Sequence, residues 1–182
     1  MKKIFLILLV LMFALNMQTL GKKRDPNVIG SIYCITLDDT SKVFLQYIAN
    51  DWTMMNSGVI RVFKRKYSAN EIVDLEQVVR GEVWFYAHAL LDAALRYGYW
   101  VKVGCSTELG DTVNIMFRLY SEGNTNHLTV SNKWYVWKIN QDKLHVGVLP
   151  KECKSYDMGW IYDPYYIVEK IKTGKYPNHE LN

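Results

Sequence analysis

His88 and Asp92 are the first residues in this sequence whose types and spacing suggest chemistry. They lie four positions apart, so a helix would place them on one side, where a carboxylate can orient an imidazole for proton transfer. That side of the predicted helix also carries Gln77 and Arg96, and it faces away from the apolar stripe. We therefore interpret the pair as part of an exposed polar helix face and predict no catalytic residue.

The three cysteines, Cys34, Cys105 and Cys153, are the next candidates. A catalytic thiol needs a lowered pKa and a nearby base, and the sequence around His127 and His145 indicates neither. His145 alternates out of phase with its apolar neighbours, so we expect it to be exposed. We instead take the three cysteines as disulfide candidates, whose pairing the sequence leaves open.

No metal or cofactor motif is present. The four histidines are scattered, and the sequence contains no Cys-x-x-Cys, calcium loop, phosphate-binding loop, dinucleotide fingerprint or nucleophile elbow. We predict no metal and no cofactor, and although enzymatic activity stays open, nothing in the sequence favours it.

Aromatic residues make up 14% of the chain and are the strongest candidates for recognition. Tyrosine and tryptophan combine a large contact area with a polar tip, which suits binding to a protein or a ligand. Core packing is the alternative interpretation for each of them. The candidates on predicted strands or in the C-terminal loop are Trp100, Trp134, Trp137, Trp160, Tyr162 and Tyr166.

The charge pattern argues against nucleic acid as a partner. The formal net charge is +4, and two of the positive charges, Lys2 and Lys3, lie at the very N-terminus. The densest basic cluster spans residues 61–66, and we interpret it as a solvated face rather than as a contact to an anionic partner.

The N-terminus has the pattern of a secretory signal peptide. Two lysines precede an unbroken apolar run of 12 residues, Ile4 to Leu15, and small residues at Thr19 and Gly21 favour cleavage after Gly21. An uncleaved membrane anchor is the alternative, although a spanning helix needs about 20 apolar residues. We therefore predict a signal peptide at 1–21, a lead-in segment at 22–37 and an exported protein, periplasmic or secreted.

Two helices are predicted in the first part of the chain, before the apolar residues change from helical spacing to alternation. Apolar residues at helical spacing predict one over 41–56. A capping box at Ser68–Glu71, followed by an apolar stripe from Ile72 to Leu90, predicts a second helix that ends at Gly98. Alternating patterns then predict strands over 99–105, 113–120, 128–130, 134–139 and 144–148, and Asp163 and Pro164 begin a short final helix.

This order predicts a single α+β domain over 38–182, in which N-terminal helices pack on a curved antiparallel meander of about five strands. With its final aromatic hairpin from Trp134–Trp137 to Val148, the region 40–149 resembles the nuclear transport factor 2-like domains, and a cystatin-like fold has almost the same element order.

We expect a non-catalytic binding protein of the cell envelope, with an envelope protein or a small ligand as partner. A small exported isomerase or hydrolase with its site inside a cone is one alternative. A membrane-anchored assembly subunit, which requires an uncleaved N-terminus, is another.

Overall fold

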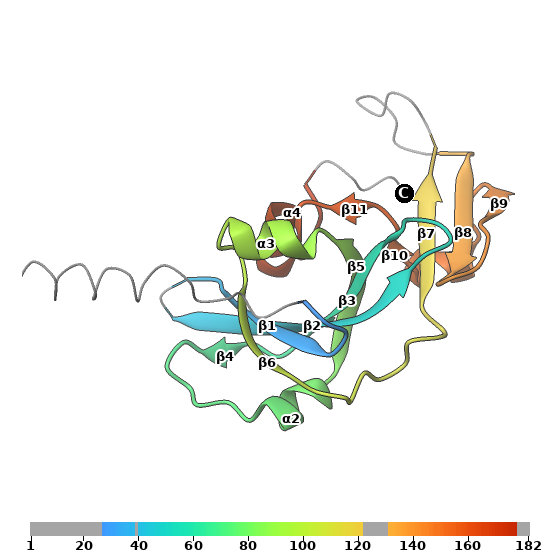
Figure 1. Ribbon diagram of the computed structural model, residues 1–182. Coiled ribbons are helices and arrows are strands. Elements are labelled where there is room, and N and C mark those ends of the chain that lie inside the picture. Colours follow the sequence, from blue (N-terminus) through green and yellow to red (C-terminus); the bar gives the residue numbers. More distant parts are fainter. Residues whose placement is uncertain (1–26, 39, 122–130, 178–182) are drawn as a thin grey trace, which may run out of the picture.

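The computed structural model describes residues 27–38, 40–121 and 131–177. In these ranges the chain forms two β-sheets and a few short helices, and Figure 1 shows the smaller sheet beside one end of the larger one.

The larger sheet has the strand order β11-β5-β3-β2-β1-β6, and β4 pairs with β2. All pairs are antiparallel except β11 with β5. Its central strand β2 is buried on both faces, which explains why its sequence is almost continuously apolar. The strands are β1 (Ser31–Thr36), β2 (Ser41–Asp51), β3 (Ser57–Phe63), β4 (Tyr67–Ser68), β5 (Val83–Ala89), β6 (Val101–Cys105) and β11 (Ile161–Tyr162).

Helices cover both faces of this sheet. Helices α3 (Leu91–Arg96) and α4 (Pro164–Thr173) pack on the face that carries Leu45 and Ile60. Helix α2 (Leu75–Val79) packs on the opposite face, against Phe44 and Phe63. None of the helices in the described part of the chain is long and apolar enough to cross a membrane.

The smaller sheet has the order β10-β7-β8-β9, with β7 (Met116–Tyr120), β8 (Trp134–Lys138) and β9 (Leu144–Gly147) forming an antiparallel meander. β10 (Asp157–Met158) pairs in parallel with β7, and a 3₁₀ helix, η1 (Lys151–Ser155), precedes it. Phe117 and Trp137 of this sheet pack against Ile48 and Val59 of the larger one, so the two sheets share a hydrophobic cluster.

A β-bulge in β2 decides which side chains meet between the sheets. Tyr47 lies opposite Ile60, but Ala49 lies opposite Val59, so β2 carries one extra residue at this point. Residues that lie opposite each other share a face, and Val59 is in turn opposite His88. The bulge therefore moves Ala49, and Asp51 two residues later, onto the face that carries His88.

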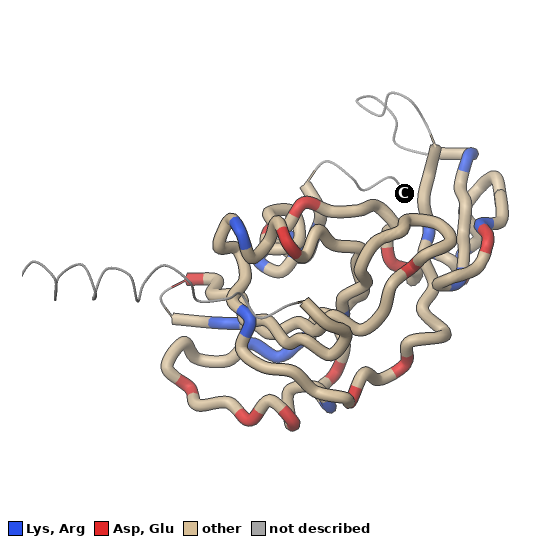
Figure 2. Tube along the Cα trace, viewed as in Figure 1, with Lys and Arg blue, Asp and Glu red and all other residues tan. Residues whose placement is uncertain are grey.

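Charged residues are unevenly distributed around this fold. Figure 2 shows acidic residues along the border formed by α2 and the segment between β6 and β7, and basic residues among the strands of the smaller sheet. The acidic residues of that border are Glu71, Asp74, Glu76, Glu82, Glu108 and Asp111.

The predicted fold class is wrong, because the N-terminal helices are absent. Residues 41–56 form β2 and the turn after it, and the region of the second predicted helix contains β4, α2, β5 and α3 instead. The capping-box contact does form, since the Ser68 amide donates to the Glu71 carboxylate at 3.2 Å. However, no helix follows it directly, and α2 begins later, with Asp74 as its N-cap.

The remaining elements follow the prediction more closely. Strands at β6, β7, β8 and β9 lie within the predicted ranges, but β6 belongs to the larger sheet, so the five-strand meander is reduced to three strands. The final helix begins after Asp163, whose side chain accepts from the Tyr165 amide, and ends at Gly174. The strand predicted over 128–130 lies outside the described residues. The element order behind the resemblance to nuclear transport factor 2-like and cystatin-like folds depended on the helices that are absent.

Candidate binding site

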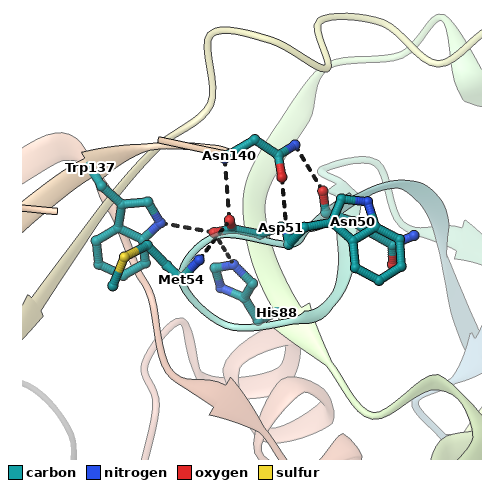
Figure 3. Close-up of polar contacts among 7 residues, drawn as sticks. Asn50, Asp51, Met54, His88, Trp137 and Asn140 are labelled. Carbon is teal, nitrogen blue, oxygen red and sulfur yellow. Dashed lines mark hydrogen bonds and ion pairs between the residues drawn. The ribbon is translucent and has the colours of Figure 1, made fainter. Parts of the chain in front are cut away.

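A buried carboxylate, Asp51, lies where the two sheets meet. Its Oδ2 atom accepts hydrogen bonds from His88 Nε2 at 3.0 Å and from Trp137 Nε1 at 2.9 Å. Its Oδ1 atom accepts from the backbone amides of Asn140 at 3.2 Å and Met54 at 3.4 Å. Figure 3 shows these groups converging on the carboxylate from three separate parts of the chain.

The electrostatics of Asp51 follow from these contacts. Burial by itself raises the pKa of this carboxyl, but the hydrogen bonds from His88, Trp137 and Asn140 outweigh burial and lower the pKa below its ordinary value. Because the carboxylate accepts, His88 Nε2 is the donor of this hydrogen bond. Nδ1 is buried without a hydrogen-bond partner among the described residues, and the imidazole packs on Phe117. This arrangement is suited to holding structure and offers no accessible proton-transfer group.

Asn140 extends the network to the turn between β2 and β3. Its side-chain oxygen accepts from the Trp52 amide at 2.8 Å, and its side-chain nitrogen donates to the Asn50 carbonyl at 2.9 Å (Figure 3). The backbone of Asn140 has a φ of 60°, a conformation that asparagine tolerates better than most residues. The hairpin end of the larger sheet is thus fixed to the smaller sheet by side-chain bonds.

A pocket of about 430 Å³ lies at this same hairpin end. One wall is the hairpin itself, with Asn50, Asn56 and Ser57, and the other is the start of α3, with Leu91 and Asp92. The remaining lining residues are Asn27, Tyr47, Gly58, Ala89, Leu90 and Ala93.

Hydrogen bonds order the polar groups around the pocket. The Tyr47 hydroxyl donates to the Asn50 side chain at 2.8 Å. Asn27 accepts from the Tyr33 hydroxyl at 2.8 Å and donates to the Asp92 carboxylate at 2.6 Å. Trp52, 66% exposed, lies in the turn that supplies Asn56. A preformed pocket beside an exposed aromatic side chain is typical of a binding surface. Its side chains are already ordered, so they lose little conformational entropy when a partner binds.

The predicted aromatic site residues form core rather than surface. Trp100, Trp134, Trp137 and Tyr162 are almost fully buried, and Trp160 and Tyr166 are half-buried. They are spread over two hydrophobic clusters and do not form one site. Trp137 contributes indirectly, through its bond to Asp51.

The interpretation of His88 and Asp92 as one exposed face is wrong for His88. The histidine lies in β5 and is fully buried, because a strand, not a helix, runs through 83–89. Asp92 lies in α3 and is exposed, so the two side chains occupy different environments. His145 is exposed, as expected.

The disulfide candidates are all free thiols in this structure. Cys34 is half-buried in β1, Cys105 is exposed in β6 and Cys153 is buried in η1. Burial raises the pKa of the Cys34 thiol, which opposes a nucleophilic role. Within the described ranges, no three histidine, cysteine or acidic side chains are placed to hold a metal ion.

The basic cluster at 61–66 is only partly a solvated face. Lys64 and Arg65 are exposed and pair with Glu82 and Glu71. Arg61 is buried, donates to Gln46 at 2.9 Å and to the carbonyl oxygens of Val79 and Glu108, and thereby ties α2 to the larger sheet.

Sequence reasoning missed the residues that build the pocket. Asn56-Ser57-Gly58 lies between two apolar runs, a pattern typical of a hairpin turn, but Gly58 also suits the end of a helix. The sequence did not indicate a role for Asp51, because the side chains that donate hydrogen bonds to its carboxylate lie in β5 and β8, far away in the sequence.

The described residues form a mostly β protein with a pocket at the hairpin end of the larger sheet. The sequence model of the family described as "Immunity protein 26" matches residues 28–126, more than half of the chain. The chain therefore belongs to the immunity protein 26 family, and this membership supports a binding role and a protein partner. Comparisons with curated proteins and with solved structures give no match.

Proposed function

We propose that this chain is an immunity protein that binds a protein toxin and neutralises it without catalysis. The family match carries the proposal, since it spans β1 to β7 and, apart from Asn27, every residue that lines the pocket. Neutralisation by binding requires a rigid complementary surface, and the side-chain bonds of Asp51 and Asn140 hold such a surface at the hairpin end.

We also propose that the protein acts outside the cytoplasm. The support is the sequence pattern of Lys2, Lys3 and the apolar run Ile4–Leu15, typical of a signal peptide cleaved after Gly21. On this proposal the partner toxin is one that acts in the cell envelope or passes through it.

The toxin proposal is tested by a rescue experiment. Genes of the source genome are cloned singly behind an inducible promoter in a test bacterium, both with and without an export signal, and those that stop growth are collected. Co-expression of the full chain is expected to restore growth against at least one of them. The purified pair should then form a complex of fixed stoichiometry. If co-expression of the full chain restores growth against none of the toxic genes, the proposal is wrong.

Export is tested separately by fractionation. The full chain is expected to appear in the periplasm or medium as a shorter species that begins near Lys22, whereas a chain without residues 1–21 stays in the cytoplasm. A full-length species confined to the membrane fraction would instead support an anchored subunit.

A further inference from the structure

We propose that the exposed end of the smaller sheet binds an acidic segment of the partner protein, at a site formed by Lys133, Tyr135, Lys143 and His145. The identity of that partner rests on the proposed function, whereas the chemistry of the site does not. These residues lie in β8, in β9 and just before them, outside the range that the family model matches. We therefore assign the site to this chain and not to the family as a whole.

Strand pairing brings the four side chains together. Tyr135 lies opposite His145, and the centroids of their rings are 4.9 Å apart. The Lys143 Nζ atom lies over the same tyrosine ring, 4.5 Å from its centroid. The carbonyl oxygen of Lys133 accepts from the Ser121 amide at 3.1 Å, which continues the pairing of β8 with β7, so the Lys133 side chain shares a face with Tyr135. Tyr135 is half-buried and the three basic residues are exposed.

The lysines gathered here have no carboxylate partner within the described ranges. In residues 27–38, 40–121 and 131–177, no acidic side chain forms an ion pair with Lys133 or Lys143. Asp142, the neighbour of Lys143 in the β8–β9 loop, is exposed and forms no ion pair in these ranges either. Figure 2 shows basic residues among the strands of this sheet and the acidic residues mainly elsewhere. Like charges on one face repel each other in the free protein, and an anionic partner would remove that repulsion.

The side chains of the site suit carboxylates. A lysine ammonium group has three N–H donors, an imidazole has at least one, and such donors form strong hydrogen bonds with a carboxylate. The Tyr135 ring adds an aromatic surface for the aliphatic part of a glutamate or aspartate. Two lysines and one histidine match a few carboxylates better than the long phosphate backbone of a nucleic acid. Membership of the family supports a protein as the partner.

The loop that precedes β9 is held in place by the rest of the fold. Asn140, near the start of this loop, donates its backbone amide to Asp51, and its side chain accepts from the amide of Trp52. A surface that is already ordered loses less conformational entropy when a partner binds. Trp52 is 66% exposed, so the turn bonded to this loop offers an apolar contact beside the charged site.

The proposal is tested first with small probes on the full chain. A peptide of three glutamates, acetylated and amidated at its ends, is titrated against the ¹⁵N-labelled protein at constant ionic strength. We expect saturable shifts of the Tyr135, Lys143 and His145 amides, with a dissociation constant on the order of 1–10 mM, since exposed charge pairs contribute little free energy each. The corresponding peptide of three glutamines has nearly the same shape without the charge, and it should bind at least about threefold more weakly. Equal binding of the two peptides would overturn the proposal.

Inorganic phosphate is the third probe, because it is an anion without a carboxylate or a peptide chain. We expect it to bind at these amides more weakly than the glutamate peptide. If phosphate binds there as tightly as the peptide, the site recognises phosphate groups and the proposal of an acidic protein segment is wrong.

Variants with a matched control locate the effect. Lys143→Gln and Lys133→Gln each remove one positive charge and should weaken the glutamate peptide about twofold to fivefold. Lys66→Gln is the same change at an exposed lysine between β3 and β4, and it should leave binding unchanged. All three lysines are exposed, so we expect the variants to keep the unfolding midpoint of the wild type. If Lys143→Gln binds the peptide as the wild type does, the proposal fails.

Self-association is a further outcome that must be distinguished, because the acidic border of a second copy also carries carboxylates. We expect the purified chain to sediment as a monomer at low and at high salt. If it instead forms dimers at low salt that Lys143→Gln dissociates, the occupant is a second copy and the proposal of a separate partner is wrong.

The same variants separate this proposal from the proposed function. If the wild-type chain relieves a toxin and the Lys133→Gln and Lys143→Gln chains bind that toxin equally well, the acidic-segment proposal fails and the immunity function stands. If the glutamate peptide binds at the site but no toxic gene is relieved, the immunity function fails and the site stands.

Discussion

The Asp51 carboxylate offers the sharpest test of the structure. It receives four hydrogen bonds, from two side chains and two backbone amides, and the residue is fully buried. Asp51→Ala removes all four acceptor contacts and leaves the His88 and Trp137 nitrogens buried without partners.

The size of the loss follows from these contacts. Breaking a buried hydrogen-bonded charge costs about 3–5 kcal/mol, a large part of a typical domain stability of about 5–15 kcal/mol. We expect Asp51→Ala to lower the melting temperature by about 6–20 °C, at about 2–4 °C per kcal/mol for a chain of this size. Asp51→Asn keeps one acceptor oxygen but turns an N–H donor group toward other donors, and we expect it to cost about 1–3 kcal/mol.

The assay is urea unfolding followed by tryptophan fluorescence, with Asp142→Asn as the control for loss of one negative charge. The pH dependence adds a second readout. The pKa of Asp51 is lowered in the folded state, so its contribution is fully present above the ordinary pKa of a carboxyl and is lost as the pH falls through the folded value. The gap between wild type and Asp51→Asn should therefore narrow below about pH 4. If Asp51→Asn and the Asp142→Asn control have the same urea unfolding midpoint at neutral pH, the reasoning is refuted.

Three further predictions concern other parts of the fold. Gly159→Ala should cost about 1–3 kcal/mol, because an added Cβ would overlap the Trp137 indole, and an unchanged urea midpoint would contradict this packing. Asp163→Ala should cost about 1 kcal/mol through loss of the N-cap bond to the Tyr165 amide, with Ser in place of Ala restoring most of it. In a thiol-reagent time course on the folded protein, exposed Cys105 should react first, and Cys34 should react more slowly because burial raises the pKa of its thiol. Reaction of buried Cys153 before Cys105 would contradict the structure.

Part of the fold was predictable because some signals are local. The Asp163–Pro164 start and Gly174 end of α4 depend on a few neighbouring atoms, so the sequence pattern and the structure agree there. The strands from 101 to 147 were found in a similar way, from apolar residues that alternate over a few positions.

The helix predictions failed for a physical reason. Phe44, Ile48 and Trp52 recur at helical spacing, but β2 is apolar on both faces because helices and a second sheet cover it, so its sequence lacks alternation. In the region 83–89, Phe85, Ala87 and Ala89 do alternate along β5, but the same stretch also fits a helical stripe. Tertiary contacts decided that this stretch forms a strand and not a helix.

The sequence by itself determined the charge, the apolar N-terminal run, the cap residues of α4 and the short alternating strands, because each depends on residues close together in the chain. Only the tertiary structure decided the pairing of β2 with β3 and β5, the bulge that turns Asp51 toward His88, and the pocket beside Asp92. Those features join segments dozens of residues apart, and the free energy that brings them together comes from burial and from hydrogen bonds that exist only once the sheets have formed.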